Sequence, residues 1–241
     1  MEQLNKILDD FIKGTKEFKG ANGGDPMAPL WFCGLENGSG KYMDFQREHN
    51  EKILNDDTYV RMPWEDQNFR GFNGKLRRLL RKHLNRLTDY PTTVAAMYSA
   101  KTFYCTNLYP LAFKNEWDGD AEIQRLTGLP TKAAYKEHCI ARRLGNPKWA
   151  EHIAAARVIV GMHQPSANDF IRLFMMNGGT PEVRKIQLRN SDSTSDSTVE
   201  IIRKPGRTLI LCPHPTSWNW NTSMDAMTQI IRDELARQTK K

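Results

Sequence analysis

The sequence has no stretch that approaches the roughly 18 consecutive apolar residues that a membrane-spanning helix needs. Its first 14 residues carry acids inside the apolar run and contain no small-residue cleavage site, which argues against a signal peptide. The four cysteines lie far apart and form no CxxC pair, which disfavours a zinc site, an iron–sulfur cluster or a disulfide framework. We therefore expect a cytoplasmic protein with no membrane association, no metal and no cofactor.

Two phosphate-binding motifs are also missing. The sequence contains neither GxxxxGK[ST] nor GxGxxG, which disfavours a nucleotide-binding α/β protein. Positive charge is in excess instead, with a formal net charge of +7 at pH 7. A basic protein suits a polyanionic partner such as DNA, although this charge alone is weak evidence for one.

Alternating strand and helix patterns indicate the fold class. Short apolar runs predict strands at 29–34, 103–108, 157–161 and 208–212. Helical spacing of apolar residues is found at about 131–144, 147–156 and 166–177. This alternation predicts a single α/β domain, a three-layer sandwich with a central, mainly parallel four-stranded sheet flanked by helices.

Four further segments complete the predicted organisation. A helix is expected within residues 1–20, and a leucine stripe opposite a basic face predicts another over 75–87. Residues 41–70 are polar and aromatic, and are expected to form a long irregular excursion over the active face. Residues 183–204 contain two strand patterns around a polar tip, which predicts an inserted hairpin. No internal repeat or linker divides the chain.

Polar residues follow each of the four predicted core strands. In open parallel sheets, ligands bind beyond the carboxyl ends of the strands. Any one polar residue at such a position means little, but together they predict a site. These residues are Glu36, Asn37, Asn107, His163 and His214.

Four short motifs occur in order across the same core. They are GLENG at 34–38, FNGK at 72–75, TNLYPL at 106–111 and CPHPTS at 212–217. The ordered set resembles the signatures of the uracil-DNA glycosylase superfamily, in which a G-x-[D/N/E]-x-G turn and a His-Pro-Ser turn each follow a strand. The resemblance implies an enzyme that flips a nucleotide out of DNA and hydrolyses the bond between base and sugar.

The resemblance assigns catalytic roles to residues of the first and last motifs. Glu36 would orient the hydrolytic water and stabilise the positive charge on the sugar. Most relatives have the shorter Asp or Asn there, so Asn37 could share this role. His214 would donate a hydrogen bond to the base oxygen as negative charge develops. The alternative interpretations are a Glu that caps a glycine-rich turn and an ordinary loop histidine.

Base recognition is assigned to the middle motifs. Asn107 carries a donor and an acceptor side by side, which can read the polar edge of a flipped pyrimidine. Phe72 would stack on the base, and His163 would line the pocket with Gly34 and Gly38. Turn packing or core packing remains the alternative for Asn107, Phe72 and His163.

The segment after the last motif would contact DNA. In the family, the loop at this position enters the minor groove and fills the space that the flipped nucleotide leaves, a role that bulky flat side chains suit. Hydroxyl groups commonly hold phosphates. The residues assigned to the DNA surface are Pro215, Thr216, Ser217, Trp218, Asn219, Trp220 and Lys75.

Gly38 indicates which group at C5 of the base the pocket could accept. Uracil-specific relatives have a bulky aromatic residue at this position, two residues after the catalytic acid, which collides with a group at C5 of the base. A glycine predicts a C5-modified pyrimidine, such as hydroxymethyluracil or glucosylated hydroxymethylcytosine. The latter is the substrate of an anti-phage branch of the superfamily, which the chain resembles in its expected open pocket. Ordinary uracil repair and an inactive protein that binds modified DNA are the alternatives.

Overall fold

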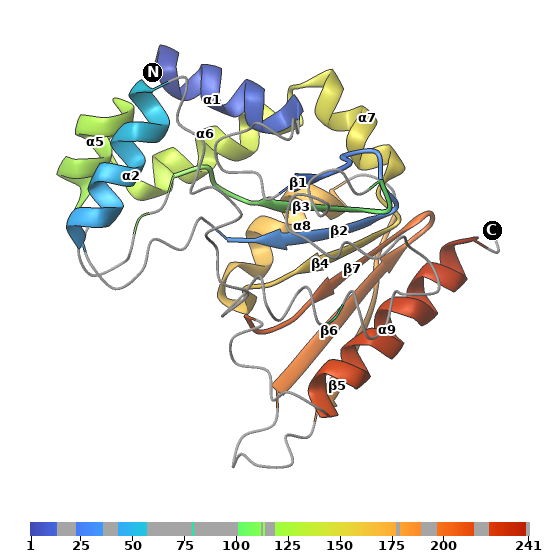
Figure 1. Ribbon diagram of the computed structural model, residues 1–241. Coiled ribbons are helices and arrows are strands. Elements are labelled where there is room, and N and C mark those ends of the chain that lie inside the picture. The colour runs from blue at the N-terminus through green and yellow to red at the C-terminus, as the bar shows by residue number, and fades with distance from the viewer. Residues whose placement is uncertain are drawn as a thin grey trace.

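The computed structural model of the protein shows an α/β fold built around one sheet (Figure 1). It describes residues 1–13, 23–35, 43–56, 79, 101–111, 113, 119–176, 179–188, 197–214 and 222–239.

Within those residues, the sheet has seven strands in the order β1-β3-β2-β4-β7-β6-β5. The four central strands β3, β2, β4 and β7 are parallel, whereas β1, β6 and β5 pair antiparallel with their neighbours. The strands are β1 (Gly23–Gly24), β2 (Leu30–Gly34), β3 (Phe103–Asn107), β4 (Val158–Gly161), β5 (Glu182–Leu188), β6 (Ser197–Lys204) and β7 (Arg207–Leu211).

The prediction of a mainly parallel four-stranded sheet is therefore wrong, because the sheet is mixed and three strands larger. β6 returns directly into β7 through a tight turn at Gly206, whose φ of 79° suits glycine, and it pairs with β7 from residue 200 to 204. The segment 183–204 thus contributes two strands to the main sheet. The short β1 has no apolar pattern that could have predicted it. Nor do the described residues show the expected three-layer arrangement.

Side chains of the central strands alternate between two hydrophobic clusters. Trp31 and Cys33 of β2 belong to the first cluster, while Leu30 and Phe32 belong to the second. Because successive side chains of a strand point to opposite faces, the two clusters lie on opposite sides of the sheet. The first cluster includes residues of several helices, and the second includes the buried face of α9. Figure 1 shows α9 on the other side of the sheet from α1 and α7.

The helices agree with the sequence patterns in part. Predicted helices at 131–144, 147–156 and 166–177 correspond to α6, α7 and α8. The irregular excursion predicted over 41–70 is wrong in its first half, where α2 forms, and α5 and α9 were not predicted. The helices are α1 (Glu2–Lys13), α2 (Met43–Asn55), α5 (Asp120–Thr127), α6 (Lys132–Leu144), α7 (Pro147–Ala155), α8 (Ala167–Met175) and α9 (Thr222–Thr239), with a 3₁₀ turn at Gln164–Ser166.

Two other expectations concern segments that the structure describes only in part. Of the helix predicted over 75–87, only Leu79 is described, and it is helical and buried. The second half of the excursion lies outside the described residues. Among the helices that are described, none is both long and apolar enough to cross a bilayer.

Candidate functional site

The carboxyl ends of the four parallel strands form one edge of the sheet. In the strand register, Gly34 lies opposite Asn107, and Gly161 lies opposite both Cys33 and Leu211. The pairing continues one residue beyond the strands, since the amides of residues 108, 162 and 212 each donate to a carbonyl of the neighbouring strand at 2.9 Å. This regular register brings the segments that follow all four strands to the same edge.

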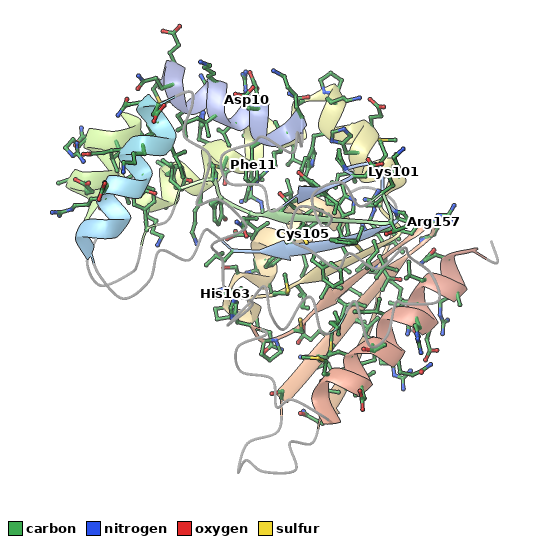
Figure 2. The ribbon with its side chains drawn as sticks, viewed as in Figure 1. Asp10, Phe11, Lys101, Cys105, Arg157 and His163 are labelled. Atoms are coloured by element: carbon green, nitrogen blue, oxygen red, sulfur yellow. The ribbon has the colours of Figure 1, made fainter. Side chains whose placement is uncertain are left out.

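Three of the predicted site residues are described on these segments. Asn107 ends β3, His163 lies two residues after β4, and His214 lies three residues after β7. Figure 2 shows His163 at this edge, while Lys101 and Arg157, which precede β3 and β4, lie at the opposite edge. The prediction that strand-end polar residues share one edge thus agrees with the topology for these three positions.

Asn107 and Gly34 are in close approach. Asn107 is 4% exposed, and a Cβ atom added at Gly34 would lie only 2.4 Å from its Oδ1 atom. Any side chain at position 34 would therefore displace the amide. Gly34 gives the Asn107 side chain room to lie across the end of the adjacent strand, which explains why a glycine ends β2.

His163 and His214 differ in their surroundings. His163 is half-buried, and its Nδ1 lies 3.1 Å from Oγ of Ser166 in the following turn. Burial lowers the pKa of His163 below its ordinary value of 6.5, and the positive charges of Lys136 and Lys132 lower it further. The imidazole is therefore neutral at neutral pH. His214 is exposed, so a bound molecule at this edge can reach it.

Tyr109 anchors the chain that follows Asn107. Its hydroxyl donates to Oδ2 of Asp169 at 2.7 Å, and Lys136 Nζ lies 3.7 Å from the same oxygen. Burial, the hydrogen bond and the carboxylate charge of Asp169 all raise the pKa of Tyr109, so the phenol stays protonated. Tyr135 accepts a hydrogen bond from the Leu111 amide at 3.0 Å. Part of the TNLYPL motif is thus structural, because it fastens the end of β3 to α6 and α8.

Arg143 is a residue of this site that the sequence interpretation missed. It lies in the last turn of α6, is 0% exposed, and donates through Nη2 to the carbonyl of Asn107 at 3.0 Å and through Nη1 to that of Leu108. Burial lowers its pKa from the ordinary value. A signal existed, because Tyr135, Cys139 and Arg143 recur every four residues and so share the buried face of the helix.

The remaining predicted site residues lie outside the described part of the chain. They belong to the turn after β2, to the segment around 72–75 and to the loop after His214. They are Glu36, Asn37, Gly38, Phe72, Lys75, Pro215, Thr216, Ser217, Trp218, Asn219 and Trp220.

The cysteines are core residues. All four are buried with free thiols, and burial raises the pKa of Cys33 to about 12 despite the opposing charge of Arg143. Among the residues that the structure describes, no three His, Cys, Asp or Glu side chains are grouped so that they could hold a metal ion.

Comparisons of the chain with models of known protein families, with curated proteins and with solved structures found no match.

Proposed function

We propose that the protein is a monofunctional DNA glycosylase that flips a pyrimidine nucleotide out of DNA and hydrolyses its N-glycosidic bond with water. One observation carries the proposal: the register of the parallel strands brings Asn107, His163 and His214 to the same edge. The proposed catalytic turn begins there too, since Glu36 is two residues beyond Gly34. Polar side chains at the carboxyl edge of a parallel sheet are the usual composition of a ligand site in this class of fold.

The reaction needs a proton acceptor near the sugar and a donor near the base. As the C1′–N1 bond breaks, its electron pair leaves with the base, and the oxygen of water bonds to C1′. Glu36 takes the proton that the water loses. His214 donates a hydrogen bond to the base oxygen where negative charge develops, and the released base is then protonated. The products are a free base and an abasic site, with no lysine adduct.

The substrate that we propose is a C5-modified pyrimidine, including glucosylated hydroxymethylcytosine. Asn107 would read the polar edge of the base, and its amide can be turned to match the uracil or the cytosine edge. Gly38 would leave space at C5. Under this proposal the protein acts on phage-type DNA in the cytoplasm.

A single incubation series tests the function. Labelled duplexes with uracil, hydroxymethyluracil or glucosylated hydroxymethylcytosine in one sequence context are incubated with the protein, cleaved with alkali and resolved on a gel. Mass spectrometry identifies the released base. Release of the C5-modified bases supports the proposal, and release of uracil alone would indicate DNA repair instead. A gel shift without product would indicate a protein that only binds DNA.

Replacing Glu36 with Gln or His214 with Ala should lower the single-turnover rate, by about 10²-fold or more for His214. DNA affinity should change far less, because both residues act on charge that exists only in the transition state. His138→Ala is a matched control, since His138 bonds Asn5 of α1 at 2.8 Å and has no place in the proposed site. If the Glu36 and His214 variants release base at the rate of this control, neither residue belongs in the mechanism.

A further inference from the structure

The guanidinium of Arg143 is buried among aromatic rings and main-chain carbonyls. It stacks over Phe11 of α1, with its carbon 4.6 Å from the ring centroid, and over Trp149 of α7 at 5.1 Å. Figure 2 shows Phe11 on the side of α1 that faces the sheet. The two terminal nitrogens of Arg143 reach the carbonyls of Asn107 and Leu108, while its Nε has no hydrogen-bond partner among the described residues.

A buried charge without a carboxylate is costly. In the described part of the chain Arg143 makes no ion pair, whereas the buried Arg203 is paired with Glu182 and Glu234. Cation–π contacts offset only part of the desolvation cost. An apolar side chain would pack between Phe11 and Trp149 more cheaply. Stability therefore gives little reason for an arginine at position 143. Its hydrogen bonds to the end of β3 give a better one.

The two hydrogen bonds fix the backbone where Asn107 leaves the sheet. A planar guanidinium with two parallel donors holds two successive carbonyls in one orientation, which a single ammonium group cannot do. The Asn107 amide also lies close to Gly34, its register partner on β2. Arg143 thus holds the main chain of Asn107, and Gly34 limits the position of its side chain.

We propose that Arg143 is a positioning residue: its fork to the carbonyls of residues 107 and 108 sets the orientation of the Asn107 amide and, through it, the choice of base. The part about base choice rests on the proposed glycosylase function, whereas the orientation of Asn107 does not. Loss of the fork lets the amide sample several orientations, so that it reads neither the uracil edge nor the cytosine edge well.

Four variants separate positioning from packing. Arg143→Met roughly keeps the length of the side chain and removes both donor nitrogens, and Arg143→Lys keeps the charge with a single donor nitrogen. Gly34→Ala pushes directly on the amide, since the new Cβ would meet Asn107 Oδ1 at 2.4 Å. Phe174→Leu is the packing control, because Phe174 packs against Trp149 in the same hydrophobic cluster, with ring centroids 5.9 Å apart.

The first readout needs no activity. The side-chain amide signals of Asn107, assigned by their loss in Asn107→Asp, are followed by ¹⁵N NMR. We expect an ordered amide in the wild type and in Phe174→Leu, a mobile one in Arg143→Met, and an intermediate one in Arg143→Lys. If the Arg143→Met amide stays as ordered as in the wild type, the positioning role is wrong. Should that variant not fold, an amide of wild-type order in Arg143→Lys has the same meaning.

The second readout is base choice. Single-turnover rates are compared for hydroxymethyluracil and hydroxymethylcytosine, which share the C5 group and differ at the edge that Asn107 would read. In Arg143→Met and Gly34→Ala the faster rate should fall about 10- to 100-fold, the usual effect of a small misplacement, and the ratio of the two rates should approach one. Phe174→Leu should keep the ratio, as should any variant that acts only by unfolding part of the protein. A kept ratio in Arg143→Met contradicts the proposal.

The two readouts fail independently. If the wild type releases no base from any DNA, the glycosylase function is wrong, and the NMR result still decides whether Arg143 orients Asn107. If base is released but the amide order does not depend on Arg143, the function stands and the positioning role falls.

Discussion

Two buried arginines occupy different regions of the molecule and have different partners. Arg203 of β6 is 8% exposed and makes a two-pronged ion pair with Glu234 of α9, at 3.0 and 2.7 Å, and a third bond to Glu182 at 2.7 Å. Arg143 is 0% exposed and bonds only uncharged carbonyls among the described residues. The first arginine connects elements of the fold, whereas the second is next to the candidate site.

The two arginines differ in the charge of their partners. Arg203 joins α9 to β6 and β5, and Thr208 of β7 also donates to Glu234, at 3.1 Å, so both Arg203 and Glu234 have charged partners. At the carboxyl edge, Arg143 has no such counterion. An unpaired buried charge lowers stability, and this sets Arg143 apart from Arg203.

The largest expected effect compares the two arginines directly. Arg203→Met should lower the free energy of unfolding by about 3–5 kcal/mol, because it leaves the Glu234 carboxylate, 2% exposed, without its main partner. Arg143→Met leaves two carbonyls without donors but removes a desolvated charge, so its cost should be about 2 kcal/mol or less. Urea unfolding followed by circular dichroism measures both.

Arg125→Met is the control for that pair of measurements. Arg125 bonds Glu122 and Glu51 on the surface with its side chain 52% exposed, so the loss should be under about 1 kcal/mol. The comparison breaks down if Arg143→Met destabilises as much as Arg203→Met, since Arg143 would then be a structural residue of the core.

A second, smaller effect is the acid sensitivity of the paired region. Burial alone would raise the pKa of Glu234, but the hydrogen bonds and charge of Arg203 outweigh it and hold the pKa below its ordinary value of 4.5. A lowered carboxyl pKa adds stability that is present above pH 4.5 and is lost as the pH falls through the folded-state pKa. In Glu234→Gln this contribution is absent at every pH.

The wild type should therefore be more stable than Glu234→Gln near neutral pH, and the difference should shrink as the pH falls below 4.5. Urea unfolding of both proteins over a pH series measures it. A difference that stays constant would mean that the carboxylate charge contributes nothing through Arg203.

The periodicity of apolar residues predicted the helices and strands whose buried residues form a regular pattern within the element. The four parallel strands and helices α6 to α8 were predicted because each has an apolar run or an amphipathic stripe. β5 was predicted as half of an inserted hairpin, although it is the edge strand of the main sheet. Its residues are mostly exposed, and pairing partners are a tertiary property that local pattern does not contain. The sequence of α2 is mostly polar, so its helix was not predicted.

The shared edge of three candidate site residues was predictable, because each lies at or just beyond the end of a predicted strand. Asn107, His163 and His214 follow apolar runs, so their shared edge follows from the sheet rule alone. Arg143 could not be assigned in this way, because its role depends on what α6 packs against. An arginine at the end of a helix is normally read as a solvated charge that favours the helix dipole. Only the burial of its i−4 and i−8 neighbours, Cys139 and Tyr135, distinguishes it.

The smallest expected effect tests whether the carboxyl edge is electrostatically positive. His163 should titrate below 6.5 in a histidine NMR experiment, first because it is half-buried and then because Lys136 and Lys132 repel its protonated form. Lys136→Met removes one of these charges, so the midpoint should move toward 6.5 without reaching it, as burial remains. Lys148→Met is the reciprocal control: it should raise the midpoint of His152, which Lys148 lowers, and leave that of His163 unchanged. Since a lowered histidine pKa costs stability as the pH falls below 6.5, Lys136→Met should also reduce that loss slightly. If the His163 midpoint does not respond to Lys136→Met, solvent screens the positive charge at this edge. The difference from the ion-paired Arg203 then concerns Arg143 alone.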